Sequence, residues 1–199
     1  PAGYELGNII HQSIEKLTKA NQLNQINLDN ELSKYQNQNP YLTLELEIWK
    51  KKLTKFITIE TQRQKQGYKI IETEKPFNFE YQDITLRGVI DRIDKKDNSY
   101  TILDYKTSSS LKIDTIKTYE KSCDFQLEFY YLSQQDKMIE NVGYYDLNGA
   151  KIKTEIMLNE KIDILKYHLK ALKTTQVNFE MCDNKNTCTY CPYKIMCQK

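Results

Sequence analysis

Two carboxylates and one lysine interrupt segments of the chain that are otherwise apolar. Asp91 lies in the first segment, Asp104 and Lys106 lie in the second, and the polar dipeptide Asp97-Asn98 separates them. Such a dipeptide favours a two-residue β-hairpin turn. In that hairpin, residues whose numbers sum to 195 face each other, so Asp91 is expected opposite Asp104. Side chains alternate along a strand, which places Lys106 on the face of Asp104.

Opposed carboxylates in a half-buried hairpin need a cation or a raised pKa, because their Cβ atoms lie only about 4.5–5.5 Å apart. Mg2+ suits oxygen ligands of this kind, and it polarises a phosphoryl oxygen and activates a bound water. A lysine ammonium beside it steadies developing negative charge. We therefore predict phosphodiester hydrolysis, with Asp91, Asp104 and Lys106 as the catalytic residues. Asp94 begins the turn and is expected on the surface, paired with Lys95 or Lys96.

The periodicity of apolar residues predicts the elements that position this hairpin. Helices are expected at the start of the chain up to about Asn21 and then over residues 27–38, 42–64, 113–119, 124–135 and 161–173. Strands are expected over residues 68–74, 77–82, 84–95, 100–106, 141–147 and 151–158, the first four as an antiparallel meander. This order predicts one α/β (α+β) unit.

Composition excludes several classes of protein. The 199 residues carry 29 Lys and Arg against 27 Asp and Glu, a balance that fits neither a disordered tail nor an evenly basic DNA-binding surface. No run approaches the ~18 apolar residues of a membrane span, and the first residues are no signal peptide, so a cytoplasmic protein without membrane contact is expected. The missing initiator Met suggests a fragment of a longer protein.

Together these motifs resemble the PD-(D/E)XK nuclease superfamily, and within it the RecB-type family. Residues 88–94 and 102–107 resemble the two acidic strands of that family. Residues 7–11 resemble its amino-terminal helix motif with a metal-binding His, residues 126–130 its Gln-x3-Tyr helix, and residues 188–197 its cysteine tail. The likeness is greatest to the carboxy-terminal nuclease domain of AddB-type helicase-nuclease subunits.

The resemblance implies a central mixed β-sheet flanked by helices, with a restriction-endonuclease-like core. On this basis residues 1–199 form a single nuclease domain. Its parts are a helical insertion with the His motif (1–66), a catalytic core (67–174) and a Cys-rich tail (175–199).

The resemblance also implies a set of site residues. A Mg2+ or Mn2+ ion is expected on His11, Asp91, Asp104 and the backbone carbonyl of Tyr105. Glu74, rather than Glu72 on the same strand face, is the candidate for a further carboxylate ligand. Gln126, Tyr130 and Arg92 are expected to support these ligands or to contact DNA.

Cys188, Cys191 and Cys197 form a C-x2-C-x5-C pattern, with Cys182 shortly before it. Metal coordination is the usual reading of such a cluster in a cytosolic chain, and both zinc and a [4Fe-4S] cluster accept four thiolates. The resemblance favours the iron-sulfur cluster, whose fourth ligand in that family is a Cys upstream of the His motif. This sequence has no Cys before Cys123, so the fourth ligand is either Cys182 or a residue missing from the amino terminus, which we favour.

The resulting functional hypothesis is a metal-dependent DNA exonuclease of recombinational repair, acting on single strands or duplex ends beside a helicase subunit. Three alternatives remain open. They are a CRISPR-adaptation iron-sulfur nuclease, a nuclease-like scaffold that binds DNA or a helicase without cleaving, and a zinc-stabilised interaction module.

Overall fold

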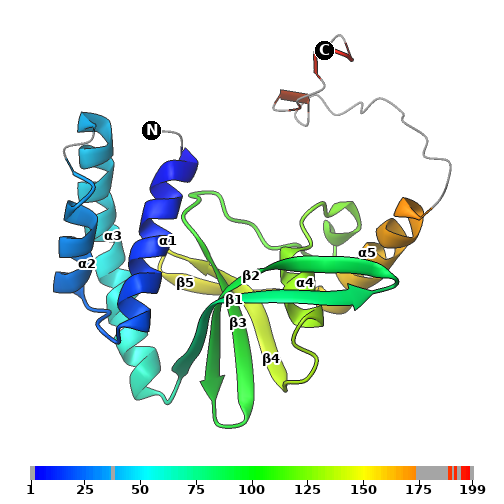
Figure 1. The fold of residues 1–199 in the computed structure, drawn as a ribbon, viewed down its shortest axis with the longest axis horizontal. Helices are drawn as coiled ribbons and strands as arrows, with labels where there is room; N and C mark the ends of the chain where they lie inside the picture. The colour runs from blue at the N-terminus through cyan, green and yellow to red at the C-terminus, as the bar shows by residue number, and fades with distance from the viewer. Residues whose placement is uncertain (1–2, 37–38, 174–187, 190, 192–193, 198–199) are drawn as a thin grey trace.

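The protein is described by a computed structural model over residues 3–36, 39–173, 188–189, 191 and 194–197. These residues form a five-stranded sheet in the order β1-β2-β3-β4-β5 (Figure 1). The strands are β1 (Lys69–Tyr81), β2 (Ile84–Lys96), β3 (Ser99–Lys106), β4 (Ile139–Asp146) and β5 (Lys151–Thr154). Within residues 3–173 the α-helices are α1 (Gly3–Lys19), α2 (Gln25–Ser33), α3 (Pro40–Lys65), α4 (Gln126–Leu132) and α5 (Leu158–Leu172).

The sheet is mixed, which confirms the predicted fold class. β1, β2 and β3 are antiparallel neighbours, β3 and β4 are parallel, and β5 returns antiparallel to β4. A parallel pair needs a crossover connection, and residues 107–138 provide it with α4. The helix α4 therefore lies in the connection between β3 and β4, two strands that are neighbours in the sheet.

The β2–β3 hairpin has the predicted register. Arg92 pairs with Leu103 and Lys96 with Ser99, and the numbers of each paired couple along this ladder sum to 195. Asp97 has φ +53°, the left-handed conformation that the first position of a two-residue hairpin turn requires. This register brings Asp91 and Asp104 to the same end of the hairpin.

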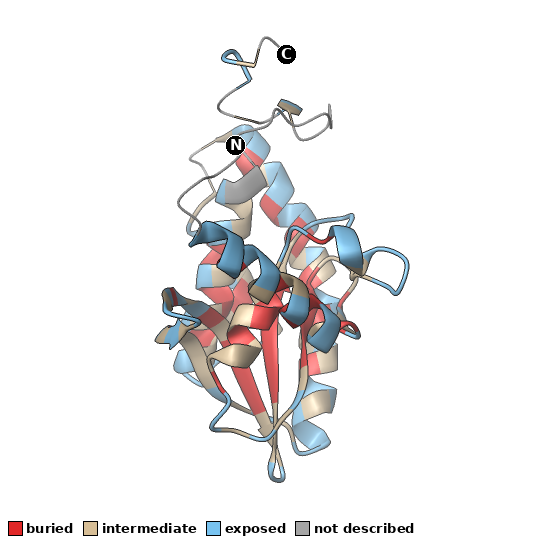
Figure 2. Cartoon of the chain, turned by 90° about the vertical axis from the view of Figure 1, so that its right-hand side faces the viewer, coloured by how far each residue is buried: buried red, intermediate tan, exposed pale blue. Residues whose placement is uncertain are grey.

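Alternation along the strands divides the core between the two faces of the sheet. Leu103 and Tyr105 pack with the helices α1, α2 and α3, whereas Ile102 packs with Leu127 and Tyr130 of α4. Figure 2 shows the buried residues concentrated in the sheet and on the helix faces that cover it. Asp104 follows Leu103 and precedes Tyr105, so it belongs to the face that α4 covers.

Side-chain hydrogen bonds cap the first turns of α2 and α3. Asn24 accepts a hydrogen bond from the Asn27 backbone at the start of α2, and Asn39 accepts one from the Tyr41 backbone at the start of α3. Asn is a favoured residue at this position, and Pro40 suits the first turn because a helix leaves that amide unbonded anyway. Of the helices in the described part of the chain, none is both long and apolar enough to cross a membrane.

Two expected elements differ in the structure. The strands expected at 68–74 and 77–82 are one strand, β1, which continues through Glu74 at φ +49° and through Pro76. Pro is tolerated because β1 lies at the sheet edge. The helix expected over 113–119 is wrong: this fully described segment contains turns, followed by a 3-10 turn at Tyr119–Lys121.

Local hydrogen bonds explain the missing helix. The Thr118 hydroxyl accepts a hydrogen bond from the Thr115 backbone at 2.9 Å and donates one to Asp114 at 3.0 Å. Side chains of Thr and Asp that bond the nearby backbone compete with helical hydrogen bonds. The remaining helices and strands lie where expected, with ends shifted by a few residues.

Candidate active site

Asp104, near the end of β3, is buried and surrounded by donors. Its Oδ1 accepts hydrogen bonds from Gln126 Nε2 at 2.8 Å and from the Tyr130 hydroxyl at 2.9 Å. Its Oδ2 lies 2.7 Å from Lys106 Nζ, as an ion pair rather than an aligned hydrogen bond. The crossover helix α4 thus brings Gln126 and Tyr130, an i, i+4 pair on one helix face, onto the acidic hairpin.

Gln126 connects the carboxylate to the lysine. Its amide nitrogen donates to Asp104, while its amide oxygen accepts a hydrogen bond from Lys106 Nζ at 2.7 Å. The Lys106 ammonium also lies over the ring of Tyr144, 5.0 Å from its centroid. Burial, followed by the charge of Asp104, raises the pKa of Tyr130, so its hydroxyl remains a proton donor. The structure therefore brings together four of the residues selected from the sequence.

Asp91 lies beside Asp104 and faces the amino-terminal helix. Its Oδ2 accepts a hydrogen bond from the Tyr105 backbone amide at 2.8 Å and lies 3.6 Å from His11 Nδ1. Burial and the charge of Asp104 raise the pKa of Asp91 to about 7. Burial lowers the pKa of His11, which favours the neutral imidazole that can act as a metal ligand.

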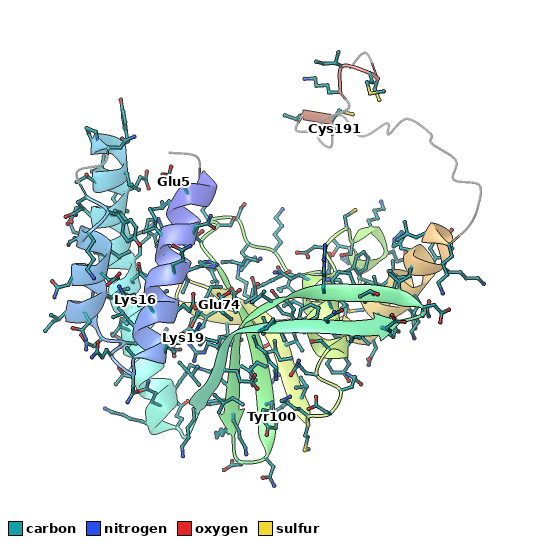
Figure 3. All side chains as sticks on the ribbon, in the orientation of Figure 1. Glu5, Lys16, Lys19, Glu74, Tyr100 and Cys191 are labelled. Atoms are coloured by element: carbon teal, nitrogen blue, oxygen red, sulfur yellow. The ribbon has the colours of Figure 1, made fainter. Side chains whose placement is uncertain are left out.

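Glu74 approaches the same carboxylates from β1, where the strand bends beside α1. Figure 3 shows it between the sheet and the lower part of that helix, which carries Lys19. Burial, then the nearby charge of Glu15, raises the pKa of Glu74, and its own charge contributes to the raised pKa of Asp91. Glu72 instead forms an ion pair with Lys75 at 2.8 Å. The charge interactions therefore favour Glu74 over Glu72 as a neighbour of the site.

The donor chemistry fits a hard divalent cation. Burial and repulsion from the Asp104 carboxylate raise the pKa of Asp91, and the neutral imidazole of His11 lies beside this pair. Oxygen and imidazole ligands of this kind suit such an ion. Among the described residues, however, no group of three or more His, Cys, Asp or Glu side chains forms an assembled metal site. The reason at Asp104 is visible, since both of its oxygens face protein donors.

Burial excludes one of the two roles expected for Arg92, a contact with DNA. Its side chain is 1% exposed and cannot reach DNA. Its guanidinium forms ion pairs with Asp94 at 2.6 Å and with Glu60 of α3 at 2.7 Å, and it donates to the Tyr105 hydroxyl at 3.0 Å. Arg92 therefore supports the Tyr105 segment from the opposite face of the sheet.

Asp94 corrects a second prediction, because it is fully buried rather than on the surface. It accepts hydrogen bonds from Arg92 and from Arg63 Nη2 at 2.7 Å. Neither Arg63 nor Glu60 was expected here, since both come from a helix that the sequence does not place against β2.

A second buried cluster behind α4 was also missed. Lys161 Nζ, on α5, lies 3.0 Å from Glu155, 3.2 Å from Glu128 and 3.5 Å from Asp114. Burial raises the pKa of Glu128 to about 7, although Lys161 opposes that shift. One signal pointed to it: Lys161 stands four residues before Leu165 in the apolar stripe of α5, where a lysine needs a buried partner.

The described part of the cysteine tail comprises Cys188, Cys191 and Cys197, each partly exposed. Cys182 lies outside the described residues. The three described thiols do not form an assembled metal group.

Two comparisons with known proteins bear on this geometry. A search of curated proteins found no match for the chain. The family model of the PD-(D/E)XK nuclease superfamily matches residues 2–198, nearly the whole sequence. Proteins of this superfamily are nucleases that generally use Mg2+ or Mn2+. With an acidic hairpin, an adjacent lysine and a mixed sheet flanked by helices, this chain belongs to the PD-(D/E)XK nuclease superfamily.

Proposed function

We propose that this chain is a divalent-metal-dependent deoxyribonuclease whose active site is centred on Asp91, Asp104 and Lys106. The observation that carries the proposal is the hydrogen-bonded chain in which Gln126 binds both Asp104 and Lys106. A buried carboxylate and an ammonium held by one amide form a preorganised pair, which is the arrangement that phosphodiester hydrolysis needs.

In the proposed mechanism the protein supplies the ligands and fixes the lysine. His11, Asp91, Asp104 and the Tyr105 carbonyl would hold a Mg2+ or Mn2+ ion, which activates water and polarises the phosphate when bound. Gln126 aims the Lys106 ammonium, whose protons stabilise the negative charge that develops on the phosphoryl oxygens. Tyr130 keeps Oδ1 of Asp104 hydrogen-bonded and thereby fixes the carboxylate plane.

The finer assignment follows the sequence resemblance to the RecB-type family. On that basis we propose an exonuclease of recombinational DNA repair that acts in the cytoplasm on single strands or duplex ends, together with a helicase subunit. An intact upstream sequence tests this role, because a long helicase-like region supports it and a short leader with one Cys favours the CRISPR-adaptation role.

For the tail we propose a [4Fe-4S] cluster on Cys188, Cys191 and Cys197, with a fourth thiolate from a residue upstream of this sequence or from Cys182. The C-x2-C-x5-C spacing supports this proposal. Iron and acid-labile sulfide measured in anaerobically purified protein distinguish the cluster from zinc, which gives neither.

One observation favours a second candidate, a scaffold that binds DNA without cleaving it. Both oxygens of Asp104 are occupied by protein donors, and the described residues contain no assembled metal group. In an active nuclease Oδ2 of Asp104 would be the oxygen available to hold a metal ion, because its contact with Lys106 is not an aligned hydrogen bond.

The deciding experiment is cleavage of end-labelled single-stranded and duplex DNA with Mg2+, Mn2+ or EDTA. Asp104→Asn and Lys106→Ala should each reduce metal-dependent cleavage by roughly 10²–10³-fold. Asp97→Asn and Lys51→Ala, at exposed positions on the turn and on α3, are the matched controls and should cleave as the wild type does. Metal-dependent cleavage that survives both active-site substitutions would place the site elsewhere. Binding without any cleavage would favour the scaffold.

A further inference from the structure

We infer that a cavity of about 350 Å3 beside α4 is a subsite for an unpaired nucleobase of the substrate strand. This inference rests on the proposed nuclease function and specifies its substrate. Aromatic side chains from two elements line the cavity, namely Phe77 of β1 and Phe125, Phe129 and Tyr130 at the start of α4 and within it. Phe125 and Phe129 are partly exposed and are the rings against which a flat aromatic ring can stack, whereas Phe77 and Tyr130 are buried and support the lining.

The cavity borders the candidate active site through two shared side chains. Gln126 and Tyr130 line it, and the same two side chains bind Asp104 at 2.8 and 2.9 Å. Whatever occupies the cavity is therefore separated from the catalytic carboxylate by a single side chain. In a nuclease, the group at that distance from the reacting phosphate is a base or sugar of the same strand.

The aromatic wall depends on a glycine. A Cβ built on Gly88 of β2 would approach the Phe77 ring to 2.7 Å, a distance that real Cβ atoms do not adopt. The absence of that side chain allows Phe77 to lie against β2 and in contact with Tyr130, whose ring centroid is 5.9 Å away. Gly88 thus allows the aromatic wall of the cavity to pack closely near the site.

The charges on the cavity rim suit a nucleotide. Arg87 is exposed at its edge and can neutralise a phosphate of the strand. Asp124 also borders the cavity, but its oxygens accept hydrogen bonds from the Gln126 backbone at 3.1 Å and from the Tyr144 hydroxyl at 2.7 Å. Arg87 therefore supplies a positive charge at the rim for a strand phosphate, while the Asp124 carboxylate is held by its two protein hydrogen bonds.

A base inside a duplex cannot enter this cavity, because both of its faces are already stacked. The occupant is therefore an unpaired base, from a single strand or from a frayed end. Stacking tolerates all four bases, so the subsite distinguishes strand state rather than sequence.

The test measures binding of a labelled oligothymidine in EDTA, where the strand is not cut, against an oligomer with the same phosphates but abasic sugars. Phe125→Leu keeps the apolar volume but removes the stacking face, and Phe125→Trp restores it. The expected result is about tenfold weaker oligothymidine binding for Phe125→Leu, unchanged abasic binding, and recovery in Phe125→Trp. Arg87→Gln should weaken both oligomers. Tyr167→Leu, at a 71% exposed aromatic residue of α5 outside this cavity, is the control.

Phe125 also contacts His168 with ring centroids 5.8 Å apart, so Phe129→Leu serves as a second variant if Phe125→Leu does not fold. Equal loss for both oligomers, or no loss for either, would overturn the subsite. The two proposals fail separately. Wild-type cleavage with no base-dependent loss would refute the subsite alone, whereas base-dependent loss in a protein that never cleaves would refute the nuclease alone.

Discussion

Replacing Glu128 by Gln is expected to stabilise the fold above pH 7 and to change its stability by less than about 1 kcal/mol near pH 5. The Glu128 side chain is fully buried, and burial raises its pKa from 4.5 to about 7 in spite of Lys161 at 3.2 Å. In the unfolded chain the carboxyl has its ordinary pKa and loses its proton earlier. Between the two pKa values the folded protein therefore binds more protons than the unfolded chain, and the free energy of unfolding falls as pH rises.

The size of this effect follows from the two pKa values. One pKa unit is worth about 1.4 kcal/mol, so the gap between 4.5 and about 7 corresponds to about 3 kcal/mol. The contribution of Glu128 is fully present below pH 4.5 and is lost as pH rises through about 7. A glutamine side chain has nearly the same shape as glutamate but carries no group that titrates in this pH range. Lys161 retains Glu155 at 3.0 Å, so its charge remains paired in the variant.

The assay is urea unfolding of the wild type and Glu128→Gln at pH 5 and pH 8.5, with a reductant present. Glu140→Gln, at an exposed position of β4, controls for the general effect of removing a carboxylate. We expect the variant to exceed the wild type by about 3 kcal/mol at pH 8.5 and by less than about 1 kcal/mol at pH 5. An equal difference at both pH values would refute the reasoning, because it would mean that Glu128 stays ionised beside Lys161 across the whole range.

Three further predictions follow from single contacts. Tyr130→Phe removes a buried hydrogen bond to the Asp104 carboxylate and should lower the cleavage rate by roughly 10–100-fold while costing only about 1 kcal/mol of stability, measured by Mn2+-dependent cleavage and by calorimetry. Arg92→Met leaves two buried carboxylates without this partner and should lower the free energy of unfolding by roughly 3–5 kcal/mol in urea, and a smaller loss would mean that water enters the cluster. Gly88→Ala should cost about 1–3 kcal/mol by the same measurement, because the new methyl group displaces Phe77, and an unchanged stability would show that the ring moves freely.

The hairpin was predictable because its information is local. A two-residue turn and strict alternation fix the register, so the relation between Asp91 and Asp104 follows from spacing alone. The same logic failed for Asp94, whose surroundings are decided by Glu60 and Arg63 on a helix thirty residues away in the chain. Strand alternation predicts which face of the sheet a side chain lies on, but it does not predict which residues of the packing helices contact that face.

The roles of Gln126 and Tyr130 show a similar limit. Their spacing indicates one helix face, and the resemblance suggested a place near the site. The exact contacts with Asp104 depend on the crossover between β3 and β4; the resemblance implied a mixed sheet, but the sequence pattern did not say which two strands are parallel. The burial of Glu128 depends on the same crossover and on α5 behind it.

The β1–β2 hairpin has a consequence for how the length of this chain can vary among relatives. Its outer half carries Phe77, Arg87 and Gly88, its inner half carries Asp91, and the turn at its tip contains Gln82 and Asp83 at positive φ. Residues added at that exposed tip lengthen the hairpin without disturbing the pairs behind it. A single residue inserted between Gly88 and Asp91 would instead turn every following side chain to the opposite face, separating the aromatic cavity from the acidic centre. Insertions and deletions are therefore expected to collect at the tip and to spare the stretch of β2 from Gly88 to Asp91, which joins the proposed base subsite to the acidic centre.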